Sequence, residues 1–119
     1  MPIPQRGEIW FTRIPTDPPE KGKRPVVVVS INARNHHPRA STVLVVPLST
    51  SVHKDEIPTH MVLEPGQTGL EARVIARAED ISAIAKLLLD PARERLRTLS
   101  STQICELARK VELAMGCLS

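Results

Sequence analysis

The chain has 119 residues, a typical length for one domain, and we expect a single domain over residues 1–119. Its 16 lysines and arginines exceed its 13 aspartates and glutamates, so the formal charge of +3 suits a polyanionic partner without requiring one. Aromatic residues make up 2% of the sequence, so Val, Leu, Ile and Ala must build the core, and aromatic platforms for stacking bases are scarce.

Several classes of protein are disfavoured by patterns that the sequence lacks. The apolar runs are shorter than the ~20 residues that span a bilayer, and the N-terminus has no signal-peptide pattern. Cys105 and Cys117 lack the close spacing of a metal site and are expected to be reduced thiols. Neither a glycine-rich phosphate loop nor a nucleophile elbow occurs. We therefore expect a cytoplasmic protein without a membrane segment, a metal site or a cofactor.

The first half of the chain predicts three strands separated by loops. Residues 7–14 mix β-formers with polar residues and stop at a proline, as a first strand would. After a loop rich in prolines and charges, the run 26–31 is continuously β-branched, which favours a central strand buried on both faces. A polar loop over residues 32–41 leads to a third strand at 42–48, whose Pro47 is expected at an edge or a bulge.

The next part of the chain predicts two more strands. Residues 60–63 form a short strand, and a turn signal at residues 65–69 separates it from a strand at residues 73–81. Residues 83–98 fit either a strand or a short helix. Five short strands joined by turns predict a small barrel.

The C-terminal segment follows the helical period. Ser100 and Gln103 form a candidate capping box, and Gly116 is placed to end the helix. The apolar residues on one face are Ile104, Leu107, Ala108, Val111, Met115 and Leu118. A stripe at this spacing predicts a helix packed on the core rather than one that enters a membrane.

Arg24 lies at the junction of a flexible loop and a rigid strand. An arginine anchored in this way recognises phosphate well, because its planar fork donates two parallel hydrogen bonds and cannot lose its proton. Considered alone, such an arginine would be an ordinary surface residue. Its significance comes from the residues that accompany it along the chain.

Several short motifs occur in a specific order. They are Gly7-Glu8-Ile9-Trp10, Arg24-Pro25-Val26-Val27-Val28-Val29-Ser30 with Asn32 and Asn35, Pro47-Leu48-Ser49-Thr50, Pro58-Thr59-His60, and the helix after Leu99-Ser100. In this order they resemble the MazF/PemK family of toxins over essentially the whole chain. The resemblance implies an α+β fold, mainly β, built as a small SH3-like β-barrel with a C-terminal helix. This fold is shared with the CcdB toxins. The resemblance also implies a homodimer and metal-independent cleavage of single-stranded RNA at short motifs.

The resemblance assigns catalytic residues. The family's active-site arginine falls on Arg24, and its hydroxyl residue falls on Ser49, with Thr50 as the rival if the register slips by one. The acidic residue of the family's loop corresponds to Glu20. In such an enzyme the 2′-hydroxyl of RNA attacks the adjacent phosphate and leaves a 2′,3′-cyclic phosphate and a 5′-hydroxyl. Arg24 would neutralise the developing charge, Ser49 would donate a hydrogen bond, and Glu20 is the first candidate for the general base.

Other residues are expected to hold the RNA or to transfer protons. His53 and His60 are rival acid or base groups, because imidazole titrates near neutral pH. The candidate RNA-binding residues are Lys21, Lys23, Thr50, His53, Lys54, Glu79 and Asp80. Two of the positions near the fifth strand depart from the family pattern, because Asp80 replaces its glutamine and Ser82 replaces its arginine. These departures bear on base recognition and phosphate affinity.

The leading interpretation is the toxin of a type II toxin-antitoxin system, neutralised by an antitoxin whose acidic, partly disordered tail occupies the RNA groove. One alternative is a non-enzymatic poison of DNA gyrase like CcdB, since the two folds are alike. Another is a degenerate barrel that binds RNA without cutting it. Arg24 with Ser49 distinguishes the ribonuclease from both.

Overall fold

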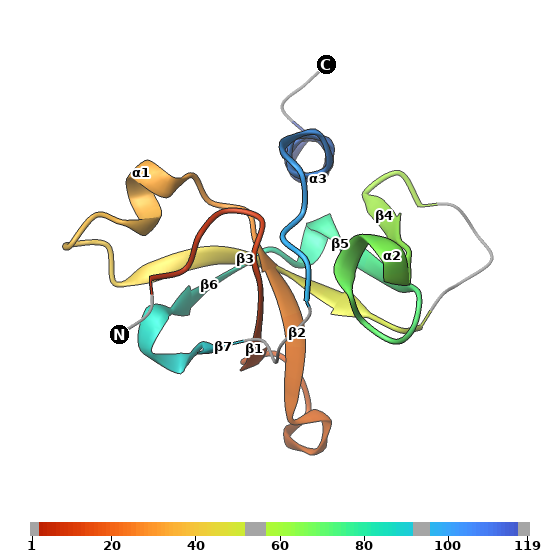
Figure 1. Ribbon diagram of the computed structural model, residues 1–119. Helices are drawn as coiled ribbons and strands as arrows, with labels where there is room; N and C mark the ends of the chain where they lie inside the picture. Colours follow the sequence, from red (N-terminus) through yellow and green to blue (C-terminus); the bar gives the residue numbers. More distant parts are fainter. Residues whose placement is uncertain (1–2, 52–56, 92–95, 117–119) are drawn as a thin grey trace.

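The computed structural model describes residues 3–51, 57–91 and 96–116 (Figure 1). Within these ranges the strands are β1 (Ile9–Arg13), β2 (Lys23–Val28), β3 (Thr42–Ser49), β4 (His60–Leu63), β5 (Val74–Arg77), β6 (Ser82–Ala85) and β7 (Asp90–Pro91). The α-helices are α1 (Asn32–Asn35), α2 (Pro65–Thr68) and α3 (Ser101–Met115), and 3-10 turns form η1 (Pro19–Lys21), η2 (Ala78–Asp80) and η3 (Lys86–Leu88).

The strands form one bent sheet in the order β4-β5-β3-β2-β1-β7, and β6 pairs with β3 beside this path. The predicted class, mainly β with a C-terminal helix, is confirmed. In the described ranges no strand pairing joins the two ends of the path, so the sheet is open and the word barrel describes it loosely.

β3 is the centre of the sheet and changes partners along its length. Its residues 42–45 pair with β6 and its residues 48–49 pair with β5, while residues 45–47 pair with β2 on the other side. Pro47 therefore lies at the changeover from β6 to β5, in an interior strand rather than at a sheet edge, which was one of the two places expected from the sequence. The interruption of strand pairing at this changeover accommodates a residue without an N–H group.

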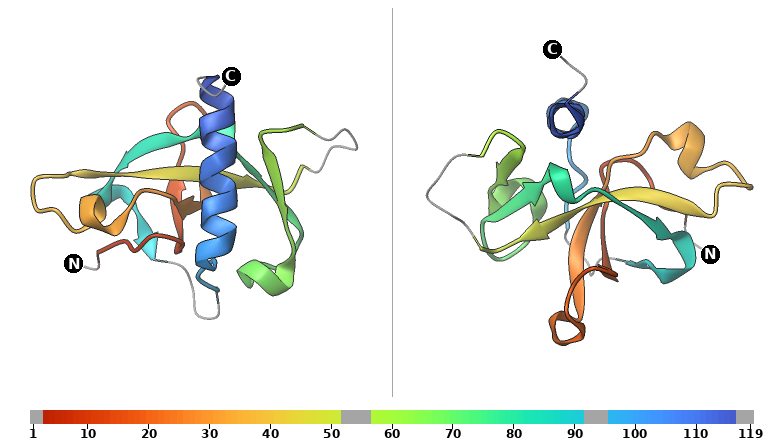
Figure 2. Two further views of the ribbon diagram at one scale, coloured as in Figure 1. Left: turned by 90° about the horizontal axis from the view of Figure 1, so that it is seen from above. Right: turned by 180° about the vertical axis from the view of Figure 1, so that it is seen from behind.

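Alternate residues of β2 and β3 fill two apolar clusters on opposite faces of the sheet. Val27 and Val46 belong to the cluster that α3 covers, whereas Val26 and Val45 pack with Trp10 in the other. The burial of both faces of β2 confirms the predicted buried strand, although the strand at the centre of the sheet is β3. Figures 1 and 2 show α3 on one side of the sheet, while the β1–β2 hairpin, with η1 at its tip, projects on the opposite side.

α3 begins and ends where its capping residues predict. The Ser100 hydroxyl accepts a hydrogen bond from the Gln103 backbone N–H at 3.2 Å, and the Gln103 side chain accepts one from the Ser100 N–H at 2.9 Å. Gly116 closes the helix with a φ of 73°, a conformation that glycine adopts without steric cost. The buried stripe consists of Ile104, Leu107 and Val111. None of the described helices is long and apolar enough to cross a membrane.

The stripe is shorter than the sequence predicts. Met115 is 66% exposed although it shares the helical spacing, and Leu118 lies outside the described residues. The apolar spacing continues beyond the point where the sheet can cover the helix.

Other strand boundaries in the structure differ from the predicted ones because strands pair with distant segments of the chain. The first strand is shorter than predicted, and the second begins at Lys23 because β1 pairs with Lys23–Pro25 as well. The polar loop after β2 contains α1, a single helical turn. The strand predicted at residues 73–81 ends at Arg77, and the ambiguous region supplies β6, η3 and β7. β6 arises because it pairs with β3, a contact that no local pattern reveals.

Candidate active site

Strand register brings Arg24 and Ser49 to the same face of the sheet. Val26 of β2 is paired with Pro47 of β3 in an antiparallel ladder. Arg24 and Ser49 lie two residues further along these strands, so the pleat directs both to the face that carries Val26 and Trp10. This is the face opposite α3, and the two side chains stand where its apolar cluster ends.

The guanidinium of Arg24 is held by an aspartate from the preceding loop. Its Nη1 donates to both carboxylate oxygens of Asp17, at 2.8 and 3.1 Å, and its Nη2 donates to the Leu48 carbonyl oxygen at 3.4 Å. The side chains of Arg24 and Asp17 are 17% and 15% exposed, so the ion pair is largely shielded from water. These contacts anchor the guanidinium, and Asp17, which the sequence did not single out, joins the candidate site.

A cavity of about 270 Å³ opens beside Arg24. Its lining residues are Lys21, Arg24, Pro25, Leu48, Ser49, Thr50 and Ser51. The Ser49 hydroxyl oxygen accepts a hydrogen bond from the Ser51 backbone N–H at 3.2 Å, which orients the side chain and leaves its hydrogen for donation. The fold thus brings together a guanidinium, a lysine and two hydroxyl side chains predicted from the sequence.

Glu20 and Lys23 do not join this cavity. Glu20 is an exposed residue of η1, and in the described part of the chain its carboxylate makes no hydrogen bond or ion pair. Lys23 precedes Arg24 in β2, so the pleat sends its side chain to the opposite face, where it forms an ion pair with Asp90. His53 and Lys54 lie outside the described residues.

Glu79 is engaged in a separate cluster at η2. It accepts hydrogen bonds from the Thr59 hydroxyl at 2.9 Å and pairs with the His60 Nε2 at 2.7 Å. Burial raises the pKa of the Glu79 carboxyl, but the hydrogen bonds from His60, from its own backbone and from Thr59 outweigh burial and hold the pKa below its ordinary value. The His60 side chain is 8% exposed, so this contact occupies the ring.

Arg77 is a second residue that the sequence interpretation missed. It is paired with His60 across β4 and β5, and it follows Ala76, which faces the α3-covered cluster. Its side chain therefore points to the face that carries Ser49. The Nε atom of Arg77 lies 3.3 Å from an Asp80 carboxylate oxygen. Arg77 thus places a guanidinium beside Asp80, although the arginine of the family pattern is replaced by Ser82 in this chain.

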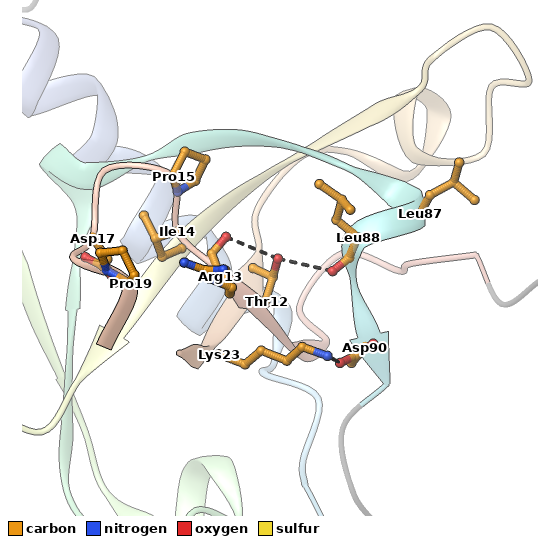
Figure 3. Close-up of a pocket in the computed structure, with 10 residues that line it drawn as sticks. All are labelled: Thr12, Arg13, Ile14, Pro15, Asp17, Pro19, Lys23, Leu87, Leu88 and Asp90. Atoms are coloured by element: carbon orange, nitrogen blue, oxygen red, sulfur yellow. Dashed lines mark hydrogen bonds and ion pairs between the residues drawn. The ribbon is translucent and has the colours of Figure 1, made fainter. Parts of the chain in front are cut away.

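A larger cavity of about 640 Å³ has Asp17 in its wall (Figure 3). It is lined by Thr12, Arg13, Ile14, Pro15, Asp17, Pro19, Lys23, Leu87, Leu88 and Asp90. Thr12 donates to the Leu88 carbonyl oxygen at 3.2 Å and ties this wall to β1. The cavity contains neither Arg24 nor Ser49, so we place the candidate chemistry in the smaller cavity.

Comparison with known proteins places the chain in a toxin family. Residues 5–115 match the family model described as the PemK-like, MazF-like toxin of type II toxin-antitoxin systems, and the chain belongs to this family. Among curated relatives, the chain is similar to Endoribonuclease MazF of Staphylococcus epidermidis, with 26% identity over 114 residues that cover 94% of this chain and 91% of the relative. The Endoribonuclease MazF of Staphylococcus saprophyticus matches to the same extent.

Solved structures share the fold. An endoribonuclease in complex with its cognate antitoxin from Mycobacterial species superimposes with a TM-score of 0.71 and 24% identity over 98% of both chains. A MazE–MazF structure from Deinococcus radiodurans superimposes with a TM-score of 0.69 and 18% identity, again over 98% of both chains.

Proposed function

We propose that this toxin is a metal-independent endoribonuclease that cleaves single-stranded RNA. The observation that carries the proposal is the meeting of Arg24 and Ser49 in one cavity. Its support from outside the chain is that the curated relatives are named endoribonucleases. A gyrase poison like CcdB or a barrel that merely binds RNA would not need this pair of side chains.

The chemistry requires orientation and charge stabilisation. RNA supplies its own nucleophile, the 2′-hydroxyl, which attacks the adjacent phosphorus and expels the 5′-oxygen, leaving a 2′,3′-cyclic phosphate and a 5′-hydroxyl. Holding these atoms in line lowers the barrier, because the ordering is completed before the reaction. Arg24 stabilises the charge that builds on the phosphate oxygens, and Ser49 donates its free hydrogen to one of them.

The general base is proposed to be Glu20. It adjoins Lys21, whose side chain lines the cavity, and RNA that covers η1 would exclude water from this carboxylate. His60 is a weaker candidate than the sequence suggested, because its ring is nearly buried against Glu79.

RNA binding would extend from the cavity along the same face. Lys21 and Thr50 contact the scissile region, and Glu79 and Asp80 contact bases or sugars. Lys23, which points to the opposite face and pairs with Asp90, is left out of this surface. His53 and Lys54, which lie outside the described residues, remain RNA-binding candidates on the grounds of the sequence alone. An acidic, partly disordered antitoxin tail would compete for this groove, because its carboxylates resemble phosphates in charge. One of the solved structures with this fold is a complex with a cognate antitoxin, and others are MazE–MazF structures. We propose a cytoplasmic homodimer as the working form.

The test compares wild type with Arg24→Ala on a long unstructured RNA in the presence of EDTA. We expect the wild type to cut the RNA and leave 5′-hydroxyl ends, and Arg24→Ala to lose cleavage while it stays folded. Arg109→Ala is the matched control, because Arg109 is exposed on α3, on the opposite side of the sheet. Equal cleavage by all three proteins would refute the assignment of Arg24.

A further inference from the structure

We propose that Asp17 is the positioning residue of this site: it holds the Arg24 guanidinium over the cavity and, in doing so, lowers affinity for RNA in favour of turnover. The inference rests on the proposed ribonuclease function and adds a residue to it. It starts from the ion pair between Asp17 and Arg24, which the sequence interpretation did not anticipate.

The contacts fix the guanidinium from two directions. Both carboxylate oxygens of Asp17 accept a hydrogen bond from Nη1, and the Leu48 carbonyl oxygen accepts one from Nη2. Leu48 precedes Ser49, so the second contact ties the orientation of Arg24 to the strand that carries the hydroxyl. An arginine held in this way has already given up the rotamer freedom that a free side chain would lose when phosphate binds.

Asp17 is itself anchored to the rigid end of β1. Its backbone N–H donates to the Ile14 carbonyl oxygen at 2.9 Å, and Ile14 is 5% exposed. Prolines at positions 15, 18 and 19 restrict the backbone on both sides of the aspartate. The carboxylate therefore keeps its place without help from a ligand. Glu20, by contrast, is exposed on η1 and is not among the hydrogen-bond or ion-pair partners of Arg24.

A carboxylate at this position has a second effect, because it is an anion beside a phosphate-binding guanidinium. It reduces the attraction of the site for RNA while it improves the orientation of the catalytic group. Removing its charge should therefore change binding and turnover in opposite directions. A residue that merely stabilised the fold would lower both.

The experiment measures kcat and KM for cleavage of a long unstructured RNA by wild type, Asp17→Asn, Asp17→Ala and Asp17→Glu. Binding is measured in parallel with single-stranded DNA of the same sequence, which lacks the attacking 2′-hydroxyl and is not cut. Glu112→Gln on the exposed side of α3 is the matched control for loss of one negative charge. Thermal melts verify that each variant is folded.

We expect Asp17→Asn and Asp17→Ala to lower kcat by about tenfold to a hundredfold, a loss typical of a misplaced catalytic group. The same variants should bind the DNA more tightly, and Asp17→Glu should recover part of kcat. Wild-type kcat in Asp17→Asn and Asp17→Ala would overturn the inference while the ribonuclease function stands. Parallel losses of turnover and binding would overturn it as well. A wild type that leaves RNA intact would overturn both proposals.

Discussion

Replacing Arg24 with lysine separates the charge of this residue from its geometry. Lysine keeps the positive charge, and its ammonium can still pair with Asp17 near the cavity. It loses the planar fork that donates to Asp17 and to the Leu48 carbonyl oxygen together. If the guanidinium acts by directed hydrogen bonds to the phosphate, the conserved charge will not rescue catalysis.

The size of the effect follows from the number of directed bonds. Loss of one preorganised donor to a developing oxyanion costs about 2.7–4 kcal/mol, which corresponds to roughly a hundredfold to a thousandfold in kcat. The cost in stability should be small, because the lysine ammonium replaces the guanidinium as the cation of the ion pair with Asp17. We expect the free energy of unfolding to change by less than about 1 kcal/mol.

The assay is single-turnover cleavage of a labelled RNA at saturating protein, so that the rate reports the chemical step rather than binding. Arg109→Lys serves as the matched substitution on the far side of the molecule. Urea unfolding of each variant reports stability. If Arg24→Lys retained a rate within about threefold of wild type, Arg24 would act as a point charge and the argument from its fork would be wrong.

Two further predictions concern the core and the η2 cluster. Leu107→Ala should lower the free energy of unfolding by about 2–5 kcal/mol in urea titrations, because Leu107 is 0% exposed, whereas Leu113→Ala, at 46% exposed, should cost far less. The lowered pKa of Glu79 means that the folded protein binds fewer protons there than the unfolded chain. Its stabilisation is therefore present above the ordinary pKa of a glutamate and is lost as the pH falls through the lowered pKa. Glu79→Gln should cost more stability near neutral pH than at about pH 4, and an equal cost at both would contradict this account.

The candidate site shows how far the sequence could lead. Arg24 was identifiable because a loop and a valine run flank it, and Ser49 because it closes the next strand in family order. Their convergence in one cavity agrees with that interpretation. Asp17 was not identifiable, because no sequence pattern indicates that an acidic residue among loop prolines pairs with Arg24, seven residues further along the chain. Arg77 carries no motif, and its face is revealed by its neighbour Ala76, which packs in the α3-covered cluster.

The sequence by itself determined the elements whose signals are local. The β-branched run made β2 a buried strand, and Ser100, Gln103 and Gly116 defined the ends of α3, because propensity and capping depend on neighbouring residues. Only the tertiary structure decided the pairing of β6 with β3, the open sheet, and the direction of Lys23 away from Arg24. These features depend on contacts between distant segments, and a register is set when such segments meet rather than by either one alone.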